Sequence, residues 1–203
     1  PDLLAHIWRN WAEKNGTTGV DDDGNGFVDD STGWDFVTGV AGCAGGEDCS
    51  TADNNPTDFN GHGTHVSGIA AAGTNNSTGG CGIAGGGGTE QGARIMALRI
   101  GYEWGDGGGY VEMDFAAQAF SYGRVKGAHA FNCSWGNNNS GGLGAATDAA
   151  VAAGIVICVA AGNSNNSTAS YLAGRTDCIA VAATDNNDVK ASVASYGSWV
   201  DVS

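Results

Sequence analysis

A short segment with two histidines provides side chains suited to acid–base chemistry. His62 and His65 lie within the segment Asn60–Gly68, and a glycine stands on each side of His62. An imidazole titrates near neutral pH, which suits a general base, and the glycines allow a tight turn and close approach of a substrate. A run of small residues follows, so we expect a helix buried on all sides, with His62 at its start. The alternative is a polar turn in which a histidine caps the helix.

The most acidic segment has the pattern of a calcium-binding loop. Residues 21–30 contain five aspartates, oxygen-bearing side chains occupy alternate positions, and Gly26 stands at the sixth position from Asp21. Calcium loops need these features, and five unneutralised carboxylates would repel one another. The twelfth position is Thr32 instead of Glu, so the loop is only EF-hand-like, and a solvated acidic turn is the alternative. The predicted ligands are Asp21, Asp23, Asn25, the Phe27 carbonyl and Asp29, with Asp30 as a substitute.

Length and charge restrict the class of protein. The 203 residues suffice for one α/β domain with a core, and no stretch is long and apolar enough to span a membrane. The net charge is −14, with only 8 lysines and arginines. This balance argues against nucleic acid as a partner, because phosphate binding needs a basic face. It agrees with an extracellular protein that binds cations and makes no membrane contact.

The six cysteines indicate an oxidising compartment and argue against a zinc site. None of them forms a C-x-x-C pair. Cys43 and Cys49 enclose a glycine-rich loop, where a local disulfide would fit secretion. The sequence leaves the connectivity open. Three further cysteines lie in apolar runs and are interpreted as buried free thiols: Cys133, Cys158 and Cys178.

Apolar runs and helical periodicity alternate along the chain. We predict helices over residues 62–73, 111–126 and 143–153, and strands over residues 93–100, 128–133, 155–161 and 178–183. Strands that alternate with helices form right-handed βαβ units around a parallel sheet, and sites lie at the carboxyl ends of the strands. Two predicted strand ends carry polar residues, in the segments Asn132–Gly136 and Val159–Ser164.

The segment Asp58–Val66 closely resembles the histidine signature of the subtilisin-like serine proteases (subtilases, peptidase S8 family). The resemblance implies that His62 is the catalytic base of an Asp/His/Ser triad. It also implies an α/β, three-layer fold in which helices flank a central parallel sheet. The family's aspartate motif would precede Pro1 and its serine motif would follow Ser203. We therefore expect residues 1–203 to be the central part of one catalytic domain, inactive by itself.

Two further segments resemble parts of the subtilase site. Ala160–Asn163 is similar to the segment that carries the family's oxyanion-hole asparagine, which implies that Asn163 donates to the oxyanion. Ser134, Trp135 and Gly136 are similar to the edge segment that pairs with the substrate backbone, with Trp135 as a pocket wall. An isolated Asn163 would be read as a turn residue, and Trp135 as a core residue. The 21–30 segment also resembles a calcium-binding insertion of some subtilases.

The resemblance implies a secreted serine endopeptidase that hydrolyses peptide bonds in polypeptide substrates. We expect a propeptide in its precursor, structural Ca²⁺, and a monomer. The alternative is a catalytically inactive, calcium-stabilised extracellular binding domain of subtilase-like fold. A binding domain has no need for both His62 and Asn163 at the positions that the family's motifs give them. Their joint presence therefore favours the enzyme.

Overall fold

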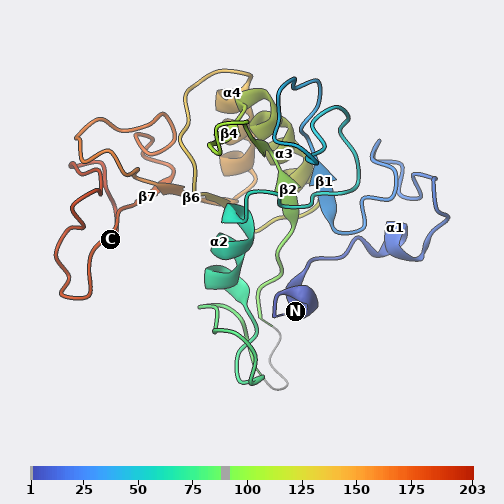
Figure 1. Cartoon of the computed structure of the whole chain (residues 1–203), viewed down its shortest axis with the longest axis horizontal. Coiled ribbons are helices and arrows are strands. Elements are labelled where there is room, and N and C mark those ends of the chain that lie inside the picture. Colours follow the sequence, from blue (N-terminus) through green and yellow to red (C-terminus); the bar gives the residue numbers. More distant parts are fainter. Residues whose placement is uncertain (1, 88–91) are drawn as a thin grey trace. The chain divides into compact units, whose positions relative to one another are not determined.

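Parallel strands linked through helices form the framework of the chain, as the alternation of apolar runs predicts. The computed structural model describes residues 2–87 and 92–203 and is drawn in Figure 1. It divides into two compact units, Pro1–Tyr110 and Val111–Ser203. The expectation of a single domain over residues 1–203 stays a prediction.

The first unit is built on one βαβ motif. Strand β1 (Gly33–Asp35) pairs in parallel with β2 (Ala97–Arg99), and helix α2 (His62–Ala71) lies between them in the sequence. A Cβ atom on Gly33 would lie 1.8 Å from the Ala97 carbonyl oxygen, so this close pairing requires glycine. The remaining elements are short: a 3-10 helix at Leu4–His6, α1 (Trp11–Asn15), and the paired strands β3 (Gly101–Glu103) and β4 (Gly109–Val111).

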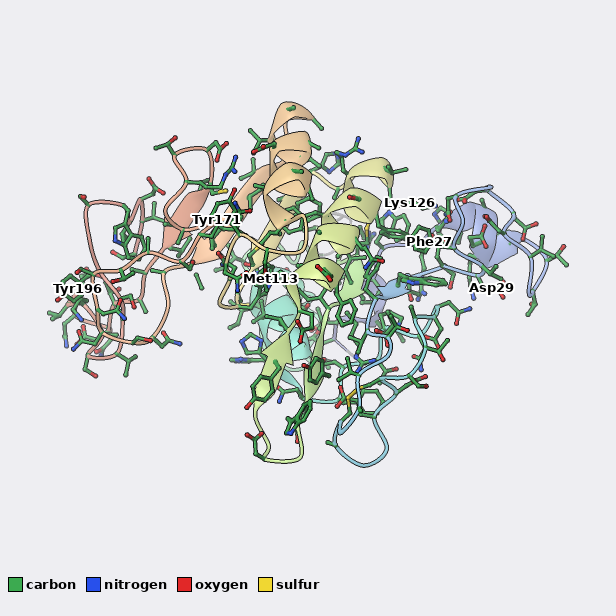
Figure 2. All side chains as sticks on the ribbon, turned by 90° about the horizontal axis from the view of Figure 1, so that it is seen from above. Phe27, Asp29, Met113, Lys126, Tyr171 and Tyr196 are labelled. Carbon is green, nitrogen blue, oxygen red and sulfur yellow. A yellow bond between two sulfur atoms is a disulfide. The ribbon has the colours of Figure 1, made fainter. Side chains whose placement is uncertain are left out.

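The second unit contains a parallel sheet of three strands and two helices. The strands β5 (Ala130–Cys133), β6 (Val156–Ala160) and β7 (Ile179–Val181) lie in the order β5-β6-β7, and α4 (Leu143–Ala152) links the first two. Register places Phe131 opposite Ile157. Helix α3 (Met113–Val125) packs along α4, as Figure 2 shows. The Phe120 ring of α3 stacks on the Phe131 ring at 4.5 Å between centroids, so α3 covers this sheet face.

The predicted helices and strands are found close to their expected positions, with one correction. Helix α2 is not buried on all sides: among its residues only Ala71 is buried, and Ile69 is 57% exposed. Its small side chains allow close packing without requiring it. Close packing occurs at the end of the helix, where the Gly82 N–H donates to the Ala72 carbonyl at 2.9 Å and the Ala84 N–H donates to the Ala70 carbonyl at 2.8 Å. The short helix α1 and the β3–β4 pair were not predicted, because segments this short show no clear periodicity.

The cysteines follow the expected pattern except at Cys158, which was predicted to be buried. Cys43 and Cys49 form a disulfide, while Cys133 and Cys178 are buried free thiols and Cys158 is half-buried. Burial, with a smaller contribution from the two neighbouring thiols, raises the pKa of Cys133 to about 12. This thiol therefore stays protonated and packs as a small apolar side chain.

Adjacent residues of β6 provide a test of the packing. Ile157 is 1% exposed on the covered face, whereas Val156 is 46% exposed. Replacing Ile157→Ala should lower the free energy of unfolding by about 2–5 kcal/mol, because a cavity forms. Replacing Val156→Ala should cost under about 1 kcal/mol. Urea unfolding of the two variants measures the difference, and equal losses would contradict this assignment of the core face.

Candidate functional site

Asp58 fixes the start of helix α2, and with it the position of His62. The helix begins at His62, directly after Gly61, whose φ of +86° lies in the left-handed region that favours glycine. The Gly61 N–H donates to Asp58 Oδ1 at 2.8 Å, and the Thr64 N–H donates to Asp58 Oδ2 at 2.7 Å. One carboxylate thus satisfies two backbone N–H groups of the first turn, and the exposed His62 side chain projects from a fixed backbone.

Asp58 is a charged group at neutral pH. Burial acts to raise its pKa, but the hydrogen bonds from Thr64 and Gly61 outweigh this effect and hold the pKa below its ordinary value. A negative charge at the N-terminus of a helix also interacts favourably with the helix dipole. Asp58 therefore stabilises the folded first turn at the pH where a histidine base operates.

The two residues between Asp58 and Gly61 are tied to strands β2 and β3. The Asn60 Nδ2 group donates to Glu103 Oε2 at 3.2 Å. The Phe59 ring lies under the Arg99 guanidinium, with the central carbon 5.3 Å from the ring centroid. The segment that leads into His62 is consequently held by its side chains as well as by the helix.

In the second unit, the predicted substrate edge and Asn163 follow neighbouring strands. Segment Ser134–Gly136 comes directly after β5, and Asn163 comes three residues after the last residue of β6. Cys133 is opposite Val159 in the parallel pair, so both strands end at the same edge of the sheet. This arrangement brings Ser134, Trp135, Gly136 and Asn163 to one end of the three-stranded sheet.

The loop that carries Asn163 is held through its backbone and leaves the Asn163 side chain exposed. The Gly162 carbonyl accepts from the Ser195 N–H at 2.9 Å, and the Asn165 N–H donates to the Val193 carbonyl at 2.8 Å. Lys190 Nζ donates to Asn165 Oδ1 at 2.9 Å and to the Ala194 carbonyl at 3.0 Å. An exposed amide on a fixed loop can donate its NH₂ group to an anion without rearrangement of the chain.

Lys190 holds the loop of Asn163 and was not predicted from the sequence. Besides its hydrogen bonds, its ammonium group lies 5.3 Å from the centroid of the Tyr196 ring, which Figure 2 labels. Nothing in the sequence around Lys190 distinguishes it from a solvated surface lysine. Its partners lie up to 25 positions away, at Asn165, and only the fold brings them together.

The carboxylates of Asp21 and Asp29, two of the predicted calcium ligands, accept hydrogen bonds from nearby backbone N–H groups. Asp21 accepts from the Asn25 and Gly26 N–H groups at 3.1 and 2.7 Å. Asp29 accepts from the Gly19 N–H at 2.7 Å. Figure 2 labels Phe27, whose ring packs edge-on against Trp34 at 4.9 Å between centroids, and Asp29. These groups shape the loop, and their predicted role as ligands stays a prediction.

A second acidic group does converge in the first unit. Carboxylate oxygens of Glu13, Asp23 and Asp30 all lie within 4.8 Å of one another, and Glu13 and Asp30 are buried. The Asn10 amide donates to Asp23 at 2.8 Å and to Asp30 at 2.6 Å. Asn25 donates to Asp30 at 2.9 Å. Of the five predicted ligands only Asp23 belongs to this group, whereas Glu13 lies outside the acidic segment and gave no signal in the sequence.

Comparison with known proteins decides the family. A sequence model described as the Subtilase family matches residues 38–203, which is most of the chain. The chain belongs to the subtilase family. The match includes His62, Ser134, Trp135, Gly136 and Asn163, and their individual roles remain predictions.

Individual relatives agree with this membership. Thermitase from Thermoactinomyces vulgaris is 40% identical over 84% of the chain, and a thermophilic serine proteinase from Bacillus sp. is 40% identical over 77%. Subtilisin BL from Lederbergia lenta is 35% identical over 78% of the chain. The matched regions cover 53%, 37% and 55% of these relatives, so the chain spans between about a third and a half of the length of the relatives it matches. Among the described residues, no helix combines the length and apolar character needed to cross a membrane.

The role of Asp58 at α2 can be tested by its pH dependence. Because folding lowers the pKa of Asp58, its stabilisation is present above the ordinary value of 3.8 and is lost as the pH falls through the folded value. Replacing Asp58→Ala should cost about 1 kcal/mol of unfolding free energy near neutral pH. The difference from the wild type should disappear on acidification. Urea unfolding of both proteins at several pH values checks this, and a loss independent of pH would contradict it.

Proposed function

We propose that the protein containing this chain is a secreted serine endopeptidase with His62 as its general base. The observation that carries the proposal is the position of His62 in a subtilase, at the first turn of a helix whose entry is fixed by Asp58. Asn163, on a held loop after β6, supports it. No serine within residues 1–203 stands in the family's G-T-S-M-A setting, so the nucleophile is placed outside this segment.

The mechanism assigns one task to each group. His62 takes the proton of the serine hydroxyl as it attacks a peptide carbonyl, and later gives this proton to the leaving amine. Asn163 donates its side-chain NH₂ to the oxyanion of the tetrahedral intermediate. An aspartate outside residues 1–203 orients the imidazole. Polypeptide substrates bind as an added strand along Ser134–Gly136, and Trp135 forms a wall of the pocket.

Steady-state kinetics of the full-length protein on a protein substrate test this assignment. Replacing His62→Ala should abolish nearly all activity, since the serine then has no base. Replacing Asn163→Ala should lower kcat by about 10²–10³-fold, the effect known for such a donor in subtilisin, a relative. His129→Ala and Asn186→Ala are matched controls at exposed positions and should leave kcat unchanged.

The competing function is that of an inactive, calcium-stabilised binding domain of subtilase fold. Such a protein would show no turnover, and the two active-site variants would behave like the wild type. If the wild type binds polypeptides without cleaving them, the binding domain is the correct assignment. Loss of turnover in His62→Ala with binding retained establishes the enzyme.

We also propose that Ca²⁺ binds in the acidic loop that follows α1, in a structural role. Oxygens on opposite sides of a Ca²⁺ ion at 2.3–2.6 Å are separated by up to about 5 Å. The Glu13, Asp23 and Asp30 oxygens meet this condition at 4.8 Å or less. Bound Ca²⁺ would neutralise their charge and connect α1 to the 21–30 loop. The alternative ligand set is the one that the sequence predicts, with Asp21 and Asp29.

Chelation distinguishes these ligand sets. Excess chelator should lower Tm by about 5–10 °C, because loss of a ligand at 100 times its Kd removes about 2.7 kcal/mol. If Glu13, Asp23 and Asp30 bind the ion, Asp30→Asn removes the effect of chelator and Asp29→Asn retains it. The reverse result favours the ligands predicted from the sequence. An unchanged Tm in the wild type would remove calcium from the account.

Secretion, a propeptide in the precursor and a monomeric mature enzyme complete the proposal. The Cys43–Cys49 disulfide supports an oxidising compartment. The net charge of −14 supports a partner that is neither nucleic acid nor an anionic membrane.

A further inference from the structure

The disulfide-closed loop between Cys43 and Cys49 carries a glutamate whose side chain is buried against the ends of β2 and β3. The Glu47 side chain is 2% exposed, and its Oε1 accepts from Arg99 Nη2 at 2.6 Å. Its Oε2 accepts from the Glu103 N–H at 2.9 Å. Glu47 therefore links the loop to the last residue of β2 and to the last residue of β3.

The rest of the loop strengthens this attachment. The Asp48 carbonyl accepts from Arg99 Nη1 at 2.5 Å, and the Ala44 N–H donates to the Glu103 carbonyl at 2.9 Å. The disulfide closes the loop on both sides of Glu47. A short closed loop has few conformations, so Glu47 is held near Arg99 at low entropic cost.

Arg99 and Glu103 are also the residues that hold the segment before His62. The Arg99 guanidinium lies over the Phe59 ring, and Glu103 accepts from the Asn60 side chain. Glu47 thus contacts directly the two residues that anchor Phe59 and Asn60. Arg99 is almost fully buried, so removal of an acceptor forces its guanidinium to seek another partner and to shift over Phe59.

We propose that Glu47, fixed by the Cys43–Cys49 disulfide, is a positioning residue for His62. It acts through Arg99 and Glu103, and it touches neither substrate nor the reacting atoms. This inference rests on the proposed role of His62 as the general base. It assigns to the disulfide loop a part in catalysis, beyond its local contribution to stability.

Two neighbouring substitutions in the full-length protein separate positioning from a general effect of charge. Glu47→Gln and Asp48→Asn each remove one negative charge from the same loop. The exposed Asp48 carboxylate accepts from the Ser50 N–H and hydroxyl at 3.1 Å, and its backbone bond to Arg99 survives the substitution. Asp48→Asn is therefore a matched control.

Kinetics and NMR give two independent results. In Glu47→Gln we expect kcat to fall by about 10-fold, within the roughly 10²-fold cost of a 1 Å misplacement. KM should stay within about twofold, because Ser134–Gly136 are not displaced. The ring resonances of His62 should shift in Glu47→Gln and in the double variant Cys43→Ser/Cys49→Ser. They should not shift in Asp48→Asn, and the His129 resonances should be constant throughout.

Each outcome decides a separate claim. If Glu47→Gln matches Asp48→Asn in kcat and in the His62 resonances, or lowers Tm with kcat unchanged, Glu47 is only structural and the inference is wrong. If the wild type lacks turnover, the proposed function fails, while the His62 resonances still decide whether Glu47 positions that side chain. Measurements below the Tm of the weakest variant exclude unfolding as the cause.

Discussion

The buried guanidinium of Arg99 joins segments of the first unit that lie far apart in the sequence. A buried arginine must keep its donors satisfied, and loss of one partner of a buried ion pair costs about 3–5 kcal/mol. Arg99 meets this requirement with carboxylates of Asp35 and Glu47 and the Asp48 carbonyl. These partners come from β1 and from the disulfide loop, so one side chain fixes segments that are about 50 to 64 positions away in the sequence.

Burial of the Asp35 carboxyl beside Arg99 disfavours its charged form. Burial raises its pKa to about 6, and the Val37 N–H and the Arg99 charge offset only part of that effect. The same guanidinium lies over the Phe59 ring, three residues before His62. Arg99 therefore contacts both the buried carboxylates and the segment that leads into the candidate catalytic base.

The second unit relies on apolar packing instead. The covered face of its sheet consists of Phe131, Cys133, Ile157, Val159 and Ala180, all buried. This face fixes where β5 and β6 end, and hence where Ser134 and Asn163 lie at the sheet edge. The loop around Asn163 is then held by backbone hydrogen bonds and by Lys190. In the first unit, ion pairs of Arg99 hold the backbone that leads to the exposed His62. In the second unit, apolar packing of the sheet holds the backbone that leads to the exposed Asn163.

The sequence predicted those features that depend on local pattern. Helix α3 has helical periodicity, strands β5 to β7 lie in continuous apolar runs, and helix α2 follows a run of small residues. The His62 and Asn163 segments are continuous motifs. It did not predict the partners of Arg99, the convergence of Glu13 with Asp30, or the role of Lys190. These depend on side chains that meet only after folding. Burial of α2 on all sides is not found within the described residues, because small residues permit close packing on every side but do not impose it.

The central claim is that His62 activates a serine in the full-length protein. Labelling with a fluorophosphonate, which reacts with activated serine hydroxyls, followed by peptide mass mapping tests this most directly. We predict one labelled serine, located outside residues 1–203, and loss of the label in His62→Ala. No labelling of the folded protein, or labelling that persists unchanged in His62→Ala, would contradict the account.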